Sequence, residues 1–301
     1  MAVTTTDHLP DTEVELEIRH RKVWSWSQPW VYLVALVVCA ISVGPVLWLV
    51  FGGFRTNAQL QLDPAGLPDP WVFRNYEDVL VGRFSERFWG QLMTSSIIAV
   101  GTTALVVVLG VSVAYAISRF PMRGTGVLFS IFAAGLMFPA TIGILPTFII
   151  LNNLNLLGNP LGVIIPQVAF AMPVTVVILT PFIKAIPKEL EEAASIDGSG
   201  RTGFFFRILL PLAKPGMVTV GVMAFVGSWN AYMLPLFVLM VGGAGSNRHT
   251  LPLGVQMFTT QFSANTSGIL AFTSLAAIPA LVFFLAMQKH IVNGLSGAVK
   301  G

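Results

Sequence analysis

The chain has 301 residues, of which 54% are hydrophobic and 10% are charged, and its formal net charge is +3. Soluble domains carry about 25% charged residues, so this composition excludes an ordinary water-soluble protein and predicts a membrane protein. The small positive charge gives no reason to expect nucleic acid as a partner.

A helix needs about 20 apolar residues to cross the hydrocarbon layer of a bilayer. Six segments meet this length, and we expect an all-α polytopic membrane protein with one helix in each: residues 30–52, 90–117, 127–151, 162–184, 216–241 and 268–288. The first segment is too long to be the core of a cleavable signal peptide, so it is expected to remain as an anchor.

Lysine and arginine are enriched on the cytoplasmic side of membrane proteins. Most of the chain's 17 basic residues fall on that side if both termini are cytoplasmic: Arg19, Arg21, Lys22, Arg119, Arg123, Lys184, Lys188, Arg201, Arg207, Lys214, Lys289 and Lys300. We therefore expect cytoplasmic tails at residues 1–29 and 289–301, and a transmembrane domain at 30–288 that includes a cytoplasmic loop at 185–215.

This cytoplasmic loop has the pattern of a short helix with an acidic beginning. Acidic side chains such as Glu192 suit the first turns of a helix because of the helix dipole. Leu190, Ala193 and Ala194 share one face by their i, i+3, i+4 spacing, and the two alanines make that face shallow enough to enter a groove. The alternative is a plain connector in which Glu192 pairs with Lys188, an exposed pair that contributes only about 0.3–0.5 kcal/mol.

The expected end of this helix is Asp197 followed by Gly198, because glycine adopts the left-handed turn that other residues resist. A second short helix is expected from Thr202, as its N-cap, to Pro211. The sequence therefore predicts a helix-turn-helix in this loop.

The spacing of Glu192-Ala193-Ala194, Gly198 and Ile208-x-Leu210-Pro211 resembles the EAA loop of permease subunits in ABC importers. Over roughly residues 30–301 the chain is similar to the second permease subunit of maltose-type carbohydrate importers. Ala231 departs from that pattern, since many relatives have an acid there. The other matching motifs are Ala114-Tyr115-Ala116, Arg119-Phe120, Arg123-Gly124, Pro139, Pro146, Leu154-Asn155-Leu156-Leu157, Trp229-Asn230, Val292-Asn293-Gly294-Leu295 and Val299-Lys300-Gly301.

The resemblance implies a six-helix permease of the type I kind in the bacterial inner membrane. Its partners would be an ATPase subunit dimer, a second homologous permease and an extracytoplasmic solute-binding protein. The residues it assigns to coupling with the ATPase are Glu192, Ala193, Ala194, Asp197 and Gly198. This chain would carry no enzyme activity and no cofactor, because ATP and Mg belong to the ATPase.

The sequence itself offers few other sites. It contains no G-x-x-x-x-G-K-[ST] loop for ATP. Its four histidines are too scattered in the sequence for a metal site, and its single cysteine cannot form a disulfide within the chain. The alternative function, an ion-coupled secondary transporter or a channel, is disfavoured because the six segments contain no Asp, Glu, Arg or His, and their one lysine, Lys184, is the last residue of the fourth segment.

Candidate residues for the solute pathway are Asn230, Trp229, Thr141 and Gln167, which interrupt otherwise apolar segments. For the polar ones, hydrogen bonding between helices is the alternative role. We also expect prolines to interrupt the helices of the third and fourth segments, which would then lie near the pathway, with a structural kink as the alternative role of any single proline. These are Pro139, Pro146, Pro166, Pro173 and Pro181.

Overall fold

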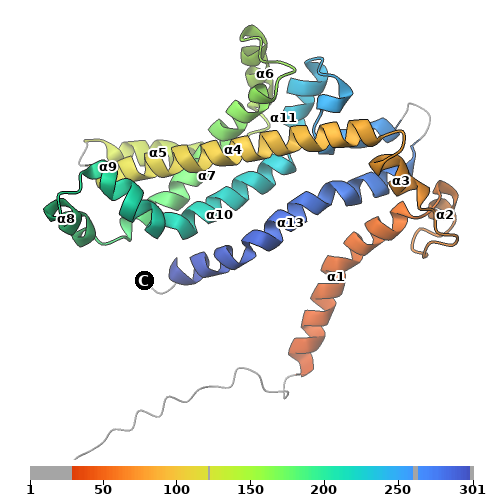
Figure 1. Cartoon of the computed structure of the whole chain (residues 1–301), viewed down its shortest axis with the longest axis horizontal. Helices are drawn as coiled ribbons and strands as arrows, with labels where there is room; N and C mark the ends of the chain where they lie inside the picture. Colours follow the sequence, from red (N-terminus) through yellow and green to blue (C-terminus); the bar gives the residue numbers. More distant parts are fainter. Residues whose placement is uncertain (1–28, 121–122, 260–263, 299–301) are drawn as a thin grey trace, which may run out of the picture. The chain divides into compact units, whose positions relative to one another are not determined.

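The computed structural model describes residues 29–120, 123–259 and 264–298 (Figure 1). The expected N-terminal tail up to residue 28 and the final residues 299–301 lie outside this description. Apart from one isolated bridge between Thr259 and Ala264, the described residues form helices and the turns between them. This confirms the all-α fold class.

The chain divides into two units, Met1–Pro45 and Val46–Gly301, and the first helix, α1 (Pro29–Gly53), crosses the boundary between them. This helix matches the predicted segment 30–52. Within the first unit its described residues are all exposed, which suits an apolar helix that lies in lipid.

The second unit contains four more long helices, which lie lengthwise beside one another (Figure 1): α4 (Ser85–Arg119), α7 (Pro160–Lys184), α10 (Leu210–Trp229) and α13 (Thr266–Ala298). Their core includes the fully buried side chains of Val106, Leu179 and Phe272. At Gly110 of α4 an added Cβ would lie 2.3 Å from Cγ2 of Thr175 in α7. A small residue here therefore lets the two backbones approach closely, as in other membrane helix pairs.

The third predicted segment, 127–151, is not one helix. It forms α5 (Thr125–Gly135) and α6 (Ile144–Asn153), so that five helices in the described residues are long and apolar enough to cross a bilayer. Pro139 lies in the break, where it lacks an N–H donor and disfavours helix at the preceding residue. The expected interruption is therefore confirmed at Pro139, whereas Pro146 lies in the first turn of α6.

Unlike the third segment, the fourth segment is not broken at its prolines. α7 is continuous although Pro166, Pro173 and Pro181 lie inside it. The expectation that these prolines interrupt the segment was wrong, because neighbouring helices can compensate for the lost hydrogen bonds of a proline in a packed bundle. In α7 the helix is held by buried side chains such as Val176 and Leu179.

The fifth and last helices also differ from their predicted bounds. The short α9 (Arg201–Phe204) continues through a π-helical turn, η1 (Phe205–Leu209), directly into α10, so Pro211 does not end a separate helix. α10 stops at Trp229 rather than 241, and α11 (Met233–Pro235) and the π-helical η2 (Leu236–Val241) follow, because Pro235 cannot donate to a preceding carbonyl. The last helix runs past 288 to Ala298, since hydropathy marks the edge of the bilayer and not the end of a helix.

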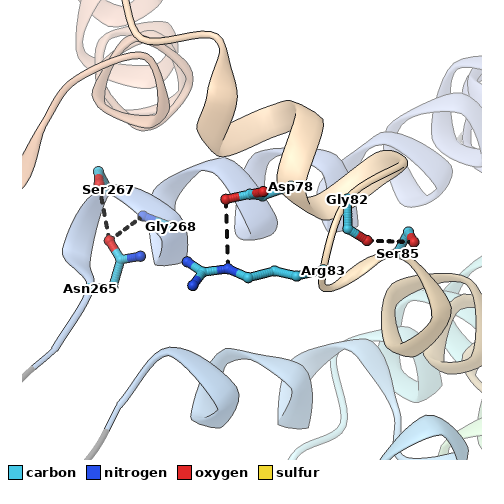
Figure 2. Close-up of polar contacts among 7 residues, drawn as sticks. All are labelled: Asp78, Gly82, Arg83, Ser85, Asn265, Ser267 and Gly268. Carbon is cyan, nitrogen blue, oxygen red and sulfur yellow. Dashed lines mark hydrogen bonds and ion pairs between the residues drawn. The ribbon is translucent and has the colours of Figure 1, made fainter.

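Short elements gather near the beginning of α4 and α13: α2 (Asn57–Leu62), α3 (Arg74–Leu80), α12 (Leu251–Gly254) and the 3₁₀ turns η3 (Ser246–Arg248) and η4 (Val255–Phe258). Figure 2 shows polar contacts in this region. Asn265 Oδ1 accepts from Ser267 Oγ at 3.0 Å and from the Gly268 N–H at 3.1 Å, so it caps the start of α13. In the turn before α4, Asp78 and Arg83 form an ion pair with 3.6 Å between Oδ2 and Nε.

Tyr76 of α3 links three helices in this region. Its hydroxyl donates to Val50 O of α1 at 2.8 Å and lies 2.9 Å from Ser274 Oγ of α13. Burial raises the pKa of the Tyr76 phenol, and the hydrogen bond with Ser274 acts in the opposite direction. The phenol therefore stays protonated at neutral pH and keeps its donor.

Candidate functional site

The helix predicted in the loop 185–215 is α8 (Glu189–Ile196), and it ends as the sequence indicated. Asp197 is its C-cap, and Gly198 follows with φ at +77°. The Ser199 N–H donates to Ala194 O at 2.8 Å, and the Gly198 N–H donates to Ser195 O at 3.1 Å. These two bonds form a Schellman motif, which confirms the left-handed glycine turn.

The two alanines of α8 lie in different surroundings. Ala194 is only 5% exposed and packs inside the bundle, whereas Ala193 is exposed. Leu190 is 40% exposed and Ile196 is 86% exposed. The outward apolar face of the helix therefore consists of Leu190, Ala193 and Ile196, and Ala194 serves instead to seat the helix on its own chain.

The neighbouring acids also differ. Glu192 is exposed, while the Glu191 side chain is 27% exposed and its Oε2 lies 3.8 Å from Arg119 Nη1 of α4. Among the described residues, the acid of α8 that forms an ion pair is thus Glu191, and the pair of Glu192 with Lys188 is not formed. Glu192 remains available to another molecule.

An apolar cluster lies under α8 and α9. Its members include Ala194, Ile183 and Ile186 at the end of α7, and Phe204 and Leu209, all buried. Since these residues come from every element around the loop, the loop rests on the ends of α4, α7 and α10. A polar cavity of about 560 Å³ borders the same region and is lined in part by Arg119, Lys184, Lys188, Glu191 and Glu192.

Two of the predicted pathway residues border one cavity of about 300 Å³, between α4, α7, α10 and the break before α6. Thr141 lies in that break, and Gln167 lies in α7. Gln167 Oε1 accepts from Thr102 Oγ1 at 3.0 Å and from Ser228 Oγ at 2.6 Å. No charged residue is among the described residues that line this cavity.

The other two predicted pathway residues border a different cavity, of about 440 Å³, between α10 and α13. Trp229 is 5% exposed, and its Nε1 donates to Ala276 O of α13 at 3.2 Å. Asn230 is exposed at the end of α10. The four residues therefore do not form one site, and Trp229 packs between helices.

Sequence reasoning missed Thr102, Ser228 and Arg119. Thr102 and Ser228 are short polar residues in apolar runs, a signal too common to select them without their shared partner Gln167. Arg119 was noted as part of a motif at the end of α4, but no role was assigned to it. Its contacts depend on α7 and α8, which are more than 60 residues away in the sequence.

Comparison with known proteins gives a family. The model of the family described as binding-protein-dependent transport system inner membrane component matches residues 106–297. The chain is 34% identical over 275 residues to the trehalose transport system permease protein SugB of Mycobacterium tuberculosis, covering 90% of this chain and 97% of that protein. It is 30% identical over 262 residues to the diacetylchitobiose uptake system permease protein NgcG of Streptomyces coelicolor, covering 85% and 83%.

A further relative is the probable ABC transporter permease protein YurM of Bacillus subtilis, 30% identical over 296 residues and covering 97% of this chain and 95% of that protein. Among solved structures, the chain resembles one from a bacterial ABC transporter involved in the import of the acidic polysaccharide alginate. The TM-score is 0.71 at 21% identity, covering 88% of this chain and 98% of that chain. This likeness shows a shared fold, that of a type I importer permease.

Proposed function

Since the chain belongs to the family of binding-protein-dependent transport system inner membrane components, we propose that it is the permease subunit of an ATP-driven sugar importer. It is a multi-pass inner-membrane protein. In the proposed role it forms half of the translocation pathway and hydrolyses no ATP itself. The observation that carries the proposal is α8, a short helix that exposes an acid and an apolar face at one end of the bundle.

The proposed partner of α8 is an ATPase subunit, which binds ATP and Mg. Leu190, Ala193 and Ile196 would enter an apolar groove of that subunit, and Glu192 would contact a donor at its rim. Gly198 fixes the turn that presents the helix, and Asp197 caps it. Closure of the ATPase dimer would displace α8 and rock the bundle between inward-facing and outward-facing states.

The solute is proposed to be an uncharged saccharide or polyol. Relatives of this chain are named for trehalose and diacetylchitobiose transport. The cavity that Gln167 and Thr141 border combines hydroxyl and amide groups with Phe170 and without charge. Hydroxyls and amides suit the edges of a sugar ring, and an aromatic face suits its C–H surface.

The proposed orientation places both termini and the loop 185–215 in the cytoplasm, following the distribution of Lys and Arg. A second homologous permease would complete the pathway. An extracytoplasmic binding protein would deliver the solute to the other face, where α2, α3 and residues 242–258 lie. One structural relative was solved in complex with an alginate pentasaccharide-bound periplasmic protein, at a TM-score of 0.58.

The test is the ATPase activity of the complete transporter in nanodiscs, assembled with its ATPase, second permease and binding protein. We expect a candidate sugar with its binding protein to stimulate hydrolysis, and Glu192→Ala to reduce this stimulation about tenfold. Glu86→Ala is the matched control, because Glu86 is also an exposed acid in the first turn of a helix, α4. Stimulation that Glu192→Ala leaves unchanged in an assembled complex would contradict the proposed docking role.

A further inference from the structure

Arg119, the last residue of α4, contacts both the end of α7 and α8. We propose that Arg119 is the positioning residue through which a displacement of α8 reaches α4. This inference rests on the proposed function of α8 as the docking helix, and it adds the connection from that helix to a membrane-spanning one.

The first part of the connection is to the backbone between α7 and α8. Arg119 Nη2 donates to Ile183 O at 2.9 Å and also to Ile186 O. These carbonyls lie in the last turn of α7 and just beyond it, where a helix has acceptors without intrahelical partners and a negative dipole end. The guanidinium therefore fixes the backbone from which α8 begins.

The second part is to α8 itself. Arg119 Nη1 lies 3.8 Å from Glu191 Oε2, and the Arg119 side chain is only 2% exposed. All eight residues of α8 are described, and Ala194 is the one among them that is buried. α8 is thus seated by a single small apolar side chain, and the Glu191–Arg119 pair is its direct polar link to α4.

Acidic and basic side chains surround Arg119. Lys184 and Lys188 line the same cavity, so two of the three acids of α8, Glu191 and Glu192, border it together with three basic side chains. The ring of the adjacent Phe120 packs edge-to-face against Tyr115 and lies 5.0 Å from the guanidinium of Arg201 in α9. Arg119 is therefore enclosed by the elements that it connects.

An arginine is required for this arrangement. Its planar fork presents several N–H donors in fixed directions, so one group can hold two carbonyls and a carboxylate together. A lysine would keep the positive charge but would offer a single ammonium on a flexible chain. Arg119→Lys is therefore the variant that removes the geometry and retains the charge.

The experiment uses the complete transporter in proteoliposomes and measures sugar molecules imported per ATP hydrolysed. We expect Arg119→Lys to lower this ratio roughly tenfold while ATP hydrolysis continues. Glu191→Gln leaves both carbonyl contacts intact and should lower the ratio by a smaller factor, about threefold. Arg123→Lys is the matched control, because Arg123 is exposed just beyond α4.

A second readout follows the motion directly. Spin labels are placed on α8 at Glu189→Cys and on α4 at Ser112→Cys, both exposed, in a Cys39→Ser background. We expect the distance between the labels to stay constant between the nucleotide-free and ATP-bound transporter when Arg119 is present. With Arg119→Lys the distance should change with nucleotide, because α8 then moves without α4.

The outcomes separate this inference from the proposed function. If Glu192→Ala uncouples the transporter but Arg119→Lys leaves both the import ratio and the label distance as in the parent, Arg119 is not the connection. If Glu192→Ala also has no effect, the docking role itself fails. Should Arg119→Lys prevent assembly, Glu191→Gln decides the matter, and an unchanged ratio and distance in that variant would overturn the proposal.

Discussion

The two ends of α4 are held in different ways. Near its beginning, the segment around α2 is fastened by the buried side chain of Arg55, which donates to several carbonyls, while at its end α8 is seated by Ala194 and linked by Arg119. Arg55, which is 2% exposed, donates to Gln59 O at 2.8 Å and Asp63 O at 2.5 Å. The difference indicates that the segment near the beginning of α4 holds its own backbone in place, whereas the attachment of α8 to the end of α4 depends on Arg119.

The variant with the largest expected effect on this difference between the two ends of α4 is Arg55→Ala. Arg55 Nη1 also reaches Pro64 O at 3.4 Å, so the variant removes one donor from each of three carbonyls. We expect a loss of about 3 kcal/mol, measured as a lower melting temperature of the purified complex. Arg87→Ala is the control, since Arg87 is exposed. Equal melting of the two variants would mean that this segment does not depend on Arg55.

A second variant tests how tightly the same end is packed. In Gly254→Ala the added Cβ would lie 2.1 Å from Gln91 Oε1 and 2.4 Å from Phe272 Cζ. We expect this overpacking to cost about 2 kcal/mol in thermal unfolding. Gly126→Ala in α5 meets no atom within 4 Å and should cause no loss. Tolerance of Gly254→Ala would show that this region can adjust.

At the other end, Gly198→Ala tests the turn after α8. Gly198 has φ at +77°, so alanine is strained there by about 1 kcal/mol although no atom lies within 4 Å of its Cβ. We expect sugar-stimulated ATP hydrolysis to fall severalfold with little change in melting temperature. Gly200→Ala, at φ −69° and with equally open surroundings, should behave as the parent chain. Equal effects of the two variants would argue against the turn geometry.

The smallest expected difference lies between the adjacent acids of α8. Glu191→Gln removes the ion pair with Arg119 and should cost about 0.5 kcal/mol of stability, whereas Glu192→Gln should cost nothing measurable in this chain. The measurement is the melting temperature of the permease with its second permease but without the ATPase. Greater destabilisation by Glu192→Gln would reverse the assignment of inward and outward acids.

Much of the fold could be predicted because the length of a membrane-spanning segment and the residues of a turn can be recognised in a short stretch of sequence. Five long helices overlap predicted segments, although α10 and α13 have other bounds, and the turn at Gly198 has the expected form. Prolines were harder: Pro139 breaks a helix, but Pro173 does not, because its effect depends on neighbouring helices that the local sequence does not specify.

The candidate site was predicted less completely. Helical spacing places Ala193 and Ala194 near one another but does not decide which of them faces the bundle. That depends on where α8 rests against Ile183 and Phe204, residues of other elements. The division of Gln167 and Trp229 between two cavities likewise follows from helix packing.

The contacts of Arg119 with peptide oxygens have a consequence for the conditions under which the protein works. Peptide carbonyls do not take up or release protons in the pH range of a cell, so the bonds to Ile183 O and Ile186 O do not vary with acidity. Salt screens exposed charge pairs strongly but buried contacts much less. The joint between α4 and the backbone that precedes α8 therefore keeps its strength when the acidity or ionic strength around it changes.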